Sequence, residues 1–519
     1  MQKHTTRIFV YAMSILLFIV SFLYPISDNV FASSKNEYYN ETYRPQFHFS
    51  PKQNWINDPN GLVYVNGEYH LFYQYNPFGN TWGNISWGHA VSKDLVHWKH
   101  LPVALKPDDL GMIFSGSAVV DKNNTSGFFK GKKDGLVAIY TSSGETQQQS
   151  IAYSTDQGRT WTKYAGNPVI KNPGIKDFRD PKVFWHDETN KWVMVVAAGN
   201  KAMFYSSKNL KGWAYMSEFG AEEGAQLGVW EMPDLFELPI HNDPKKTKWF
   251  LKVNTNPGGT KEGYRSQYFI GEFDGTTFKN DNPPDTVLWT DYGKDFFAAQ
   301  SWSNVPDRRI WIAWMNNWQY AEKIPTNPWR GSMTIPREVT LIEIPNKGVR
   351  LIQKPVEELK QLRKEKYMLK NQLVIPKTNL LSKIKDDTFE IVAKVELDSA
   401  KEFGFKVRKG EKEETIIGYD AVENKLFVDR TSSGETDFSE QFPEKFEAPL
   451  SPKDGKIKMH IFVDRSSVEV FGNDGKAVIT SRIFPSPKSQ GIEVYSIDGN
   501  VKLNSLEVYD LKSVWKNNE

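Results

Sequence analysis

The chain has 519 residues, which is too long for one ordinary hydrophobic core and predicts two domains. Its 65 Lys and Arg residues nearly balance 63 Asp and Glu residues, and no long basic run occurs, so the charge pattern disfavours nucleic acid and other polyanions as partners. The absence of cysteine excludes disulfides, thiolate catalysis and cysteine-ligated metals.

The N-terminus has the pattern of a secretory signal peptide. Lys3 and Arg7 precede an apolar run over 8–24, and Val30-Phe31-Ala32 places small residues, Val30 and Ala32, at the expected cleavage positions. We therefore predict a signal peptide over 1–32 and a secreted, extracellular protein with no membrane contact after cleavage. The run is close to the lower length for crossing a bilayer, so an uncleaved anchor is the alternative.

Five apolar runs with β-strand character recur along the first two thirds of the chain. Their starts lie 56 to 67 residues apart, and they cover residues 69–75, 136–141, 192–197, 249–254 and 310–315. A repeat longer than fifty residues without helical periodicity is typical of four-stranded propeller blades. The high content of Trp, Tyr and Phe also favours strands. We predict an all-β fold with a five-bladed β-propeller catalytic domain over 33–355.

A short motif precedes each apolar run and marks the start of a blade. The residues at these positions are Asp58, Ser115, Asp180, Asp234 and Asp295. After the first motif, a strand over 62–65 leads into Asn66-Gly67, a strong signal for a β-hairpin. If each blade begins with its innermost strand, the five motifs share one rim of the central channel.

The pattern changes after Pro355. A helix-like segment over 356–366 predicts a linker. Beyond it, apolar residues alternate with polar ones in two segments, at Phe389, Ile391, Ala393, Val395 and Leu397 and at Ile457, Met459, Ile461 and Val463. This period of two predicts a C-terminal antiparallel β-sandwich over 367–519, whose simplest role is to brace the propeller.

Three acidic motifs carry the functional signal. They are Trp-Ile-Asn-Asp-Pro-Asn-Gly around Asp58, Phe-Arg-Asp-Pro around Asp180 and Trp-Glu-Met-Pro-Asp around Glu231. Each acid alone is most simply a turn residue or a solvated side chain. Three acids brought to one rim instead suggest glycosidic bond cleavage, which needs one carboxylate and one carboxylic acid.

The neighbours of each acid in sequence suggest its role. Amides at Asn57 and Asn60 could keep Asp58 ionised, while the apolar Trp230 and Met232 could favour protonation of Glu231. The cation of Arg179 should hold Asp180 ionised, so that Asp180 accepts hydrogen bonds from sugar hydroxyls.

These motifs resemble those of the β-fructofuranosidases, the family of invertases, inulinases and levanases, in sequence, order and spacing. The resemblance runs from about Tyr43 to the C-terminus and includes residues 462–471 of the second domain. Within the family the chain looks most like the secreted bacterial levanases. The resemblance implies a five-bladed propeller with a β-sandwich, in agreement with the repeat count.

The resemblance also implies the reaction: retaining hydrolysis of β-fructofuranosyl bonds in levan, possibly inulin, and sucrose, without a cofactor. Asp58 would be the nucleophile and Glu231 the acid/base, with their carboxyl groups about 5 to 5.5 Å apart, and Asp180 would hold two fructosyl hydroxyls. The matching motifs further suggest substrate-binding positions, namely Asn57, Gln74, Trp82, Phe114, Ser115, Arg179 and Trp318. For Trp82 and Trp318, ordinary core packing is the competing interpretation.

One residue departs from the family pattern. The family usually carries cysteine directly after the acid/base glutamate, and Met232 stands there in this chain. A thioether cannot donate a hydrogen bond, so we expect a different pH profile with activity retained.

Other functions remain as alternatives. His89, His97 and His100 could suggest a metal enzyme, but their spacing fits no helix-borne ligand pattern, so we predict no metal site. A non-catalytic secreted fructan-binding lectin is disfavoured by the presence of both Asp58 and Glu231. A fructosyltransferase would use the same fructosyl-enzyme intermediate and stays open. The sequence does not predict the preference among fructans, exo or endo attack, or the oligomeric state.

Overall fold

The computed structural model describes residues 38–131, 134–258 and 263–515, and the regular secondary structure of these residues is almost entirely β-strand. The predicted all-β class is therefore confirmed. The signal segment predicted over 1–32 lies outside the described residues. Among the described residues, no helix is long and apolar enough to cross a membrane.

The first three blades are separate antiparallel sheets whose strands follow chain order. The first contains β1 (Asn54–Val65), β2 (Glu68–Asn76), β3 (Ser86–Ser92) and β4 (Trp98–Leu105), with the short β19 (Trp329–Arg330) beside β1. The second contains β5 (Met112–Val120), β6 (Leu136–Ser143), β7 (Gln147–Ser154) and β8 (Thr162–Lys163). The third contains β9 (Phe178–His186), β10 (Lys191–Ala198), β11 (Lys201–Ser207) and β12 (Ala214–Phe219).

The fourth and fifth blades are joined. The fourth contains β13 (Val229–Ile240), β14 (Asp243–Asn256), β15 (Arg265–Phe273) and β16 (Phe278–Asn280). The fifth contains β17 (Phe297–Ser301), β18 (Arg309–Trp314), β20 (Arg337–Ile344) and β21 (Gly348–Pro355). A single parallel pair, Ile240 with Leu341, links them into one eight-stranded sheet, a connection that the repeat pattern did not predict.

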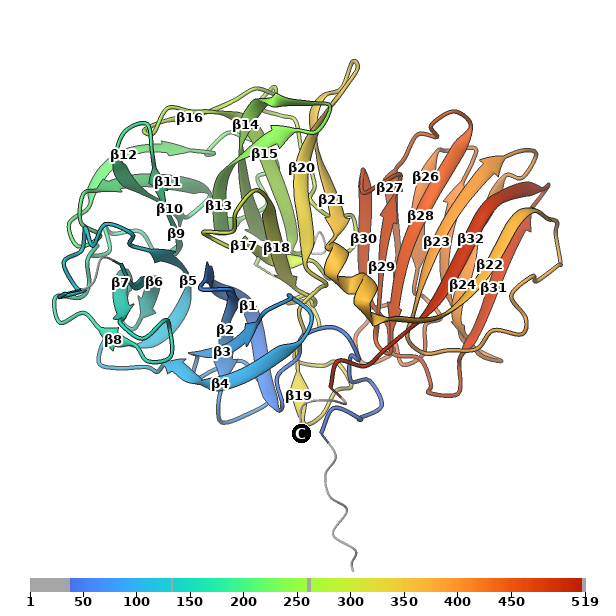
Figure 1. Cartoon of the computed structure of the whole chain (residues 1–519), viewed down its shortest axis with the longest axis horizontal. Coiled ribbons are helices and arrows are strands. Elements are labelled where there is room, and N and C mark those ends of the chain that lie inside the picture. The colour runs from blue at the N-terminus through green and yellow to red at the C-terminus, as the bar shows by residue number, and fades with distance from the viewer. Residues whose placement is uncertain (1–37, 132–133, 259–262, 516–519) are drawn as a thin grey trace, which may run out of the picture. The chain divides into compact units, whose positions relative to one another are not determined.

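The first strands of the five blades close a ring. β1 contacts β5, β5 contacts β9, β9 contacts β13, β13 contacts β17, and β17 contacts β1 (Figure 1). Each predicted apolar run lies in the second strand of its blade, where both faces are buried between neighbouring blades. The chain therefore contains the predicted five-bladed β-propeller.

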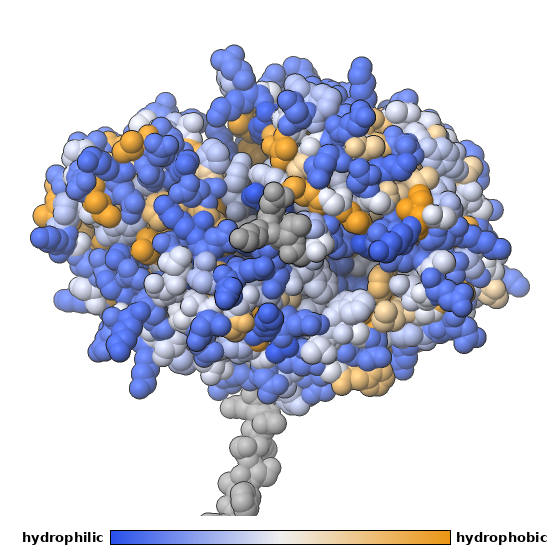
Figure 2. All heavy atoms as spheres, turned by 180° about the vertical axis from the view of Figure 1, so that it is seen from behind, coloured by the Kyte–Doolittle hydropathy of each residue, from blue (hydrophilic) through white to orange (hydrophobic). Residues whose placement is uncertain are grey.

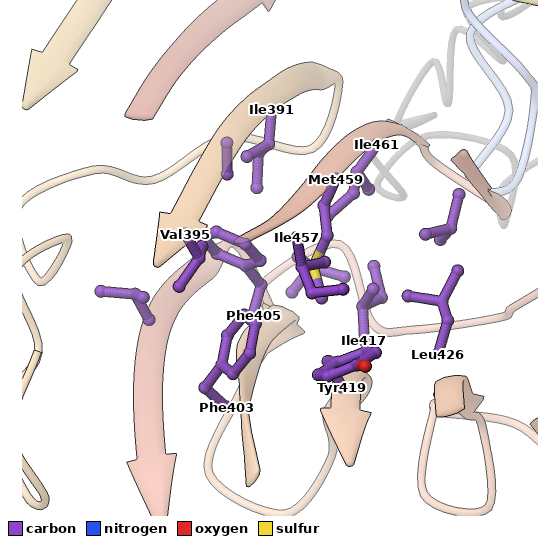
Figure 3. Close-up of a cluster of buried hydrophobic side chains, with 14 of the residues drawn as sticks. Ile391, Val395, Phe403, Phe405, Ile417, Tyr419, Leu426, Ile457, Met459 and Ile461 are labelled. Atoms are coloured by element: carbon purple, nitrogen blue, oxygen red, sulfur yellow. The ribbon is translucent and has the colours of Figure 1, made fainter. Parts of the chain in front are cut away.

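The C-terminal part is a sandwich of two antiparallel sheets. One sheet contains β22 (Arg363–Val374), β32 (Val501–Leu511), β23 (Phe389–Leu397), β28 (Lys456–Asp464), β29 (Ser467–Gly472) and β30 (Ala477–Arg482). The other contains β27 (Lys445–Pro449), β26 (Lys425–Asp429), β25 (Thr415–Asp420), β24 (Glu402–Lys409) and β31 (Gly491–Ile497). Apolar side chains that alternate along β23 and β28 meet those of β24 and β25 in one core (Figure 3).

The segment predicted as a linker is partly a strand. A 3₁₀ helix, η1 (Glu357–Leu362), follows the propeller, and Leu359 and Leu362 on it are buried. β22 then begins at Arg363, before the sandwich boundary predicted at 367. The strand starts this early because Arg363 already pairs with Leu511 of β32.

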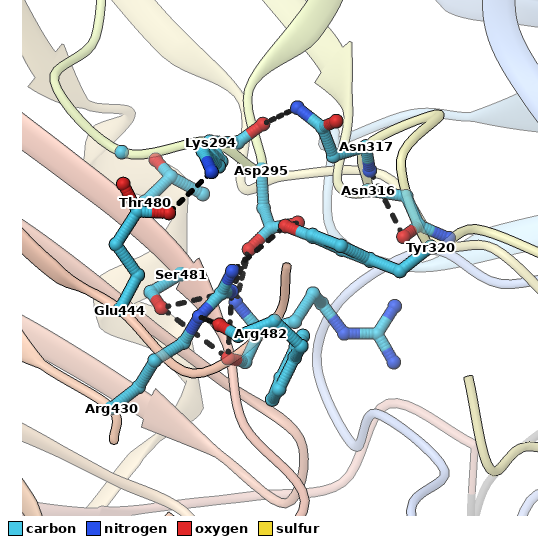
Figure 4. A network of polar contacts seen from close by, with 12 residues as sticks. Lys294, Asp295, Asn316, Asn317, Tyr320, Arg430, Glu444, Thr480, Ser481 and Arg482 are labelled. Carbon is cyan, nitrogen blue, oxygen red and sulfur yellow. Dashed lines mark hydrogen bonds and ion pairs between the residues drawn. The ribbon is translucent and has the colours of Figure 1, made fainter. Parts of the chain in front are cut away.

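Buried charges connect the propeller to the sandwich. Arg337 on β20 forms ion pairs with Asp291 and with Glu469 on β29. Asp295 accepts hydrogen bonds from Arg430 of the sandwich and from Tyr320 (Figure 4). These bonds assign a physical role to the 462–471 segment, because its acidic residues hold the two domains together.

The surface has no dominant apolar region on the side seen in Figure 2. Hydrophilic residues cover most of that face, and apolar residues occur as small scattered groups. Such scattered exposure is ordinary for a folded protein.

Candidate active site

A cavity of about 530 Å³ lies at the propeller end where the inner strands begin. All ten residues predicted for the site line it: Asn57, Asp58, Gln74, Trp82, Phe114, Ser115, Arg179, Asp180, Glu231 and Trp318. These residues come from separate parts of the chain, so the ring of inner strands is what brings them together.

The inner strands are irregular at the motifs. The register of the ladder shifts between Ile56 and Pro59 in β1 and between Glu231 and Asp234 in β13. Comparable shifts occur in β5, in β17 and in the pairing of β9 with β10. Asp180 and Met232 adopt positive φ angles of 66° and 52°. A bulge of this kind redirects a side chain. Each acidic motif contains a proline, which fits an irregular position because proline donates no hydrogen bond to the ladder.

Asp58 is held by two donors on the cavity floor. Ser115 Oγ donates to Oδ2 at 2.7 Å, and Asn57 Nδ2 donates to Oδ1 at 3.2 Å. Burial raises the pKa of Asp58 to about 6; the hydrogen bond from Ser115 opposes this, and the charge of Glu231 adds to it. The predicted contact with Asn60 is wrong, because the Asn60 amide donates to the carbonyl of Pro59 and accepts from Gln74 Nε2.

Glu231 faces polar groups rather than apolar ones. Arg179 Nη2 donates to Oε1 at 2.8 Å, and Asn256 Nδ2 donates to the same oxygen at 2.9 Å. Trp230 and Met232 point into separate buried apolar clusters. The expectation of apolar surroundings for Glu231 is therefore wrong, because alternate residues of a strand face opposite sides.

Met232 acts through its backbone. Its N–H donates to Asp180 Oδ2 at 3.0 Å, and its side chain packs with Trp55 and Trp314. The groups that contact the Glu231 carboxylate are Arg179 and Asn256. This geometry does not support the expectation that the thioether tunes Glu231.

Asp180 lies beside a cation but is deeply buried. Burial raises the pKa of Asp180 to about 7 and outweighs the charge of Arg179, whose Nε lies 3.9 Å from Oδ2. The expectation that the cation of Arg179 holds Asp180 ionised is therefore not supported, because Arg179 only partly offsets the effect of burial on the pKa of Asp180. Arg179 divides its charge among three acids, since it also pairs with Glu231 at 2.8 Å and with Asp177 at 2.6 Å.

Aromatic rings form the walls of the cavity. Trp82 is 40% exposed at the mouth and meets Phe114 edge-on, with 6.0 Å between ring centroids. Trp318 packs on Trp55 and Trp314 and borders the cavity. Both tryptophans named in the predictions thus lie at the cavity rather than inside the core.

Several lining residues were not predicted. They are Gln147, Asp177, Asn256, Tyr264, Gln319, Tyr320, Glu322 and Lys323. Asp177 could have been found beside the Phe-Arg-Asp-Pro motif, whereas the others lie in loops or strand ends without a chemical signature.

Two of the five residues that open the blades do not reach the cavity. Asp234 pairs with Lys182 at 3.1 Å, and Asp295 accepts a hydrogen bond from Arg430 of the sandwich.

A buried lysine lies behind the acidic residues. Lys252 is fully buried and donates from Nζ to the carbonyl of Met232 at 2.6 Å. Burial lowers the pKa of Lys252 to about 7, and the charges of Asp234, Asp58 and Asp180 oppose that shift. This cation was missed because a single lysine in a β-strand carries no sequence signal.

The three histidines considered as metal ligands do not converge. His89 contacts His70, His97 bonds Asp94, and His100 bonds Tyr39. In the described residues, no group of three or more His, Cys, Asp or Glu side chains is arranged to hold a metal ion.

Comparisons with known proteins agree with this architecture. The chain is 58% identical over 491 residues to the levanase of Bacillus subtilis (strain 168), a match that covers 93% of this chain and 72% of that protein. It is 44% identical to the extracellular exo-inulinase of Aspergillus awamori, covering 92% of this chain and 96% of the relative. The crystal structure of exo-inulinase from Aspergillus awamori superposes with a TM-score of 0.86 at 43% identity, covering 92% of this chain and all of that one.

Family models match both domains. The model of the N-terminal domain of glycosyl hydrolases family 32 matches residues 48–355, and the model of the C-terminal domain matches residues 358–510. Together they span the propeller and the sandwich. The chain therefore belongs to glycosyl hydrolase family 32.

Proposed function

We propose that this protein is a retaining glycosidase that hydrolyses β-fructofuranosyl bonds in fructans, levan above all, and in sucrose. The observation that carries the proposal is the meeting of Asp58 and Glu231, from β1 and β13, in one cavity of a family 32 hydrolase. The names of its relatives, a levanase and an exo-inulinase, support levan and inulin as substrates, and sucrose is proposed from the resemblance of the acidic motifs to those of the β-fructofuranosidases.

In the first step, a carboxylate oxygen of Asp58 attacks the anomeric carbon of the terminal fructosyl unit. Glu231 gives its proton to the glycosidic oxygen, the bond to that oxygen breaks, and a fructosyl ester forms on Asp58. Ser115 and Asn57 each hold one oxygen of Asp58, so the carboxylate is oriented before the substrate arrives.

In the second step, Glu231 takes a proton from water while the water oxygen attacks the anomeric carbon. The ester bond breaks and fructose leaves with its configuration retained. Arg179 and Asn256 both bond Oε1 of Glu231, and no described residue bonds Oε2. Oε2 is therefore the oxygen that carries the transferred proton.

Asp180 would hold the sugar in place. Its Oδ2 accepts the N–H of Met232, which leaves Oδ1 to bond fructosyl hydroxyls. Trp82, Phe114 and Trp318 would pack on the apolar faces of the sugar, and Gln74 would contribute a polar contact. We expect the carboxyl groups of Asp58 and Glu231 to lie about 5 to 5.5 Å apart, as retention requires.

We also propose that the protein is exported, with the propeller over 33–355 as the catalytic domain and the sandwich over 367–519 as its support. The support for export is the charged and apolar pattern over 1–32, together with the similarity to an extracellular exo-inulinase. Detection of the mature protein in the culture medium, with a new N-terminus near residue 33, tests this proposal.

The function is tested with levan, inulin and sucrose assayed side by side. Proton NMR of the first product should detect β-fructofuranose before it equilibrates, and inversion would contradict the proposed roles. The chain lengths of the products distinguish exo from endo attack. Sugars longer than the substrate at high sucrose would instead identify the enzyme as a fructosyltransferase.

A further inference from the structure

A second cavity, of about 490 Å³, forms a basic groove between the propeller and the sandwich. We call it the lysine groove, and its lysines are Lys354, Lys394, Lys453, Lys456, Lys458 and Lys476. They come from β21, β23, β28 and two turns, so the lysines are gathered by the fold and not by a basic run. A search for runs in the sequence could not detect them.

The charge of the lysine groove is out of proportion to that of the chain. Its six lysines face two aspartates, Asp454 and Asp474, which leaves four positive charges in excess. The whole chain has a net charge of only +2. The remainder of the chain therefore carries a net charge of −2, against an excess of four positive charges in the groove.

These lysines are poorly compensated within the protein. Lys458 pairs with Asp474 at 3.0 Å, but the other five have no ion pair within 4.0 Å with any described residue. A compensating charge for Lys456 and Lys394 is the partly exposed Glu396, which lies opposite Lys456 in the ladder. Lys394 on β23 lies directly opposite Lys458 on β28 in the antiparallel ladder. Like charges at such positions destabilise a sheet, so the arrangement is unfavourable for folding alone.

We propose that the lysine groove binds a linear polyanion that carries phosphate groups along its length. Lysine ammonium groups act as separate point charges, and the lining has no arginine that could grip a single phosphate through two bonds. A row of such charges from both domains suits a chain of phosphates better than one anion. The site would attach the enzyme to a phosphate-rich surface without occupying the catalytic cavity.

The proposal is tested with long-chain inorganic polyphosphate and the full-length protein. Wild-type protein should bind it with an affinity that falls as salt rises, and the Lys394→Gln/Lys456→Gln double variant should bind about tenfold or more weakly, with a shallower salt dependence. Lys412→Gln, which removes an exposed lysine from a turn elsewhere in the sandwich, is the matched control and should bind like wild type. Hydrolysis of sucrose should be unchanged in all three proteins.

Three results would overturn the proposal. Equal polyphosphate binding by wild type and the double variant would mean that the lysine groove is not the site. Competition by orthophosphate at the same phosphate concentration, as effective as that by polyphosphate, would mean that the site takes a single anion. If the melting temperature of the double variant rises while its binding of polyphosphate is unchanged, the two lysines only repel neighbouring charges and do not bind a polyanion.

Discussion

Two of the buried clusters of charge differ in how their acids are paired. At the junction of the domains, Arg337 lies between Asp291 and Glu469, and His48 bridges Asp464 and Glu469, so each of these acids contacts a basic side chain. In the catalytic cavity, Asp177, Asp180 and Glu231 share Arg179, whereas the hydrogen-bond partners of Asp58 among the described residues are the neutral Ser115 and Asn57. The excess of acids over basic partners is therefore larger in the cavity.

The pKa values follow this difference at two of the three junction acids. Burial alone would raise the pKa values of Asp464 and Glu469, but His48 and Arg337 hold them below their usual range. At Asp291 burial outweighs Arg337 and raises the pKa. Burial raises the pKa values of Asp58 and Asp180 because their partners are too few. We therefore expect the pairs of Asp464 and Glu469 to stabilise the fold, whereas the cavity charges weaken it and remain available for chemistry.

The largest expected effect is the loss of catalysis on Asp58→Asn. The amide cannot attack the anomeric carbon, so kcat should fall roughly 10⁴-fold or more. The melting temperature should rise at pH 7, because a buried charge beside Glu231 is removed. This gain should shrink as the pH falls from 7 toward 4, since wild-type Asp58, with a raised pKa, then becomes neutral in the folded state.

Rates and melting curves across pH check both parts of this prediction. Asp58→Asn with ordinary turnover would refute the nucleophile assignment. A melting temperature below that of wild type at pH 7 would refute the claim that the cavity charges weaken the fold.

The junction should respond in the opposite sense. Arg337→Met leaves Asp291 buried without a cation and leaves Glu469 with only His48, so the free energy of unfolding should fall by about 3–5 kcal/mol. Arg308→Met is the control, because Arg308 pairs with Glu358 at a partly exposed site and should contribute at most about 1 kcal/mol. Denaturant unfolding measures both, and equal losses would contradict the comparison.

Lys252→Met should affect the cavity without touching the substrate. Loss of the bond to the Met232 carbonyl would release the segment that carries Glu231 and bonds Asp180, and kcat should fall between about tenfold and hundredfold. Loss of the cation should also move the acidic limb of the pH profile upward, because Lys252 lowers the pKa of Asp58. A merely structural role would change stability and leave the pH profile in place.

The smallest effect is a shift of the pH profile through Ser115. The nucleophile must be ionised, so kcat/KM should fall about tenfold per pH unit below a midpoint set by the Asp58 pKa of about 6. Ser115→Ala removes a hydrogen bond that lowers this pKa, so the midpoint should move to higher pH. A wild-type midpoint near 4, the ordinary value for aspartate, would show that burial does not control Asp58.

The sequence allowed much of this organisation to be predicted. The spacing of the apolar runs identified five blades, and the alternation at Phe389–Leu397 identified a sandwich strand, because both patterns come directly from strand geometry. The ring of inner strands then explains why motifs far apart in the chain meet in one cavity.

The surroundings of individual groups could not be predicted. Neighbours in sequence such as Trp230 and Asn60 point away from the acids beside them, whereas Asn256 and Lys252 reach the site from the adjacent strand β14. Side chains on a bulged strand take directions that sequence order does not specify. For the same reason the lysine groove has no counterpart in the charge pattern along the chain.

The most direct test of the central claim is to trap the intermediate on Asp58. In a Glu231→Ala variant given a fructoside with a good leaving group, the first step should proceed while the second is slow. Mass spectrometry should then find one fructosyl unit on the peptide that contains Asp58. A fructosyl unit on another residue, or rapid release of fructose of inverted configuration, would contradict the account.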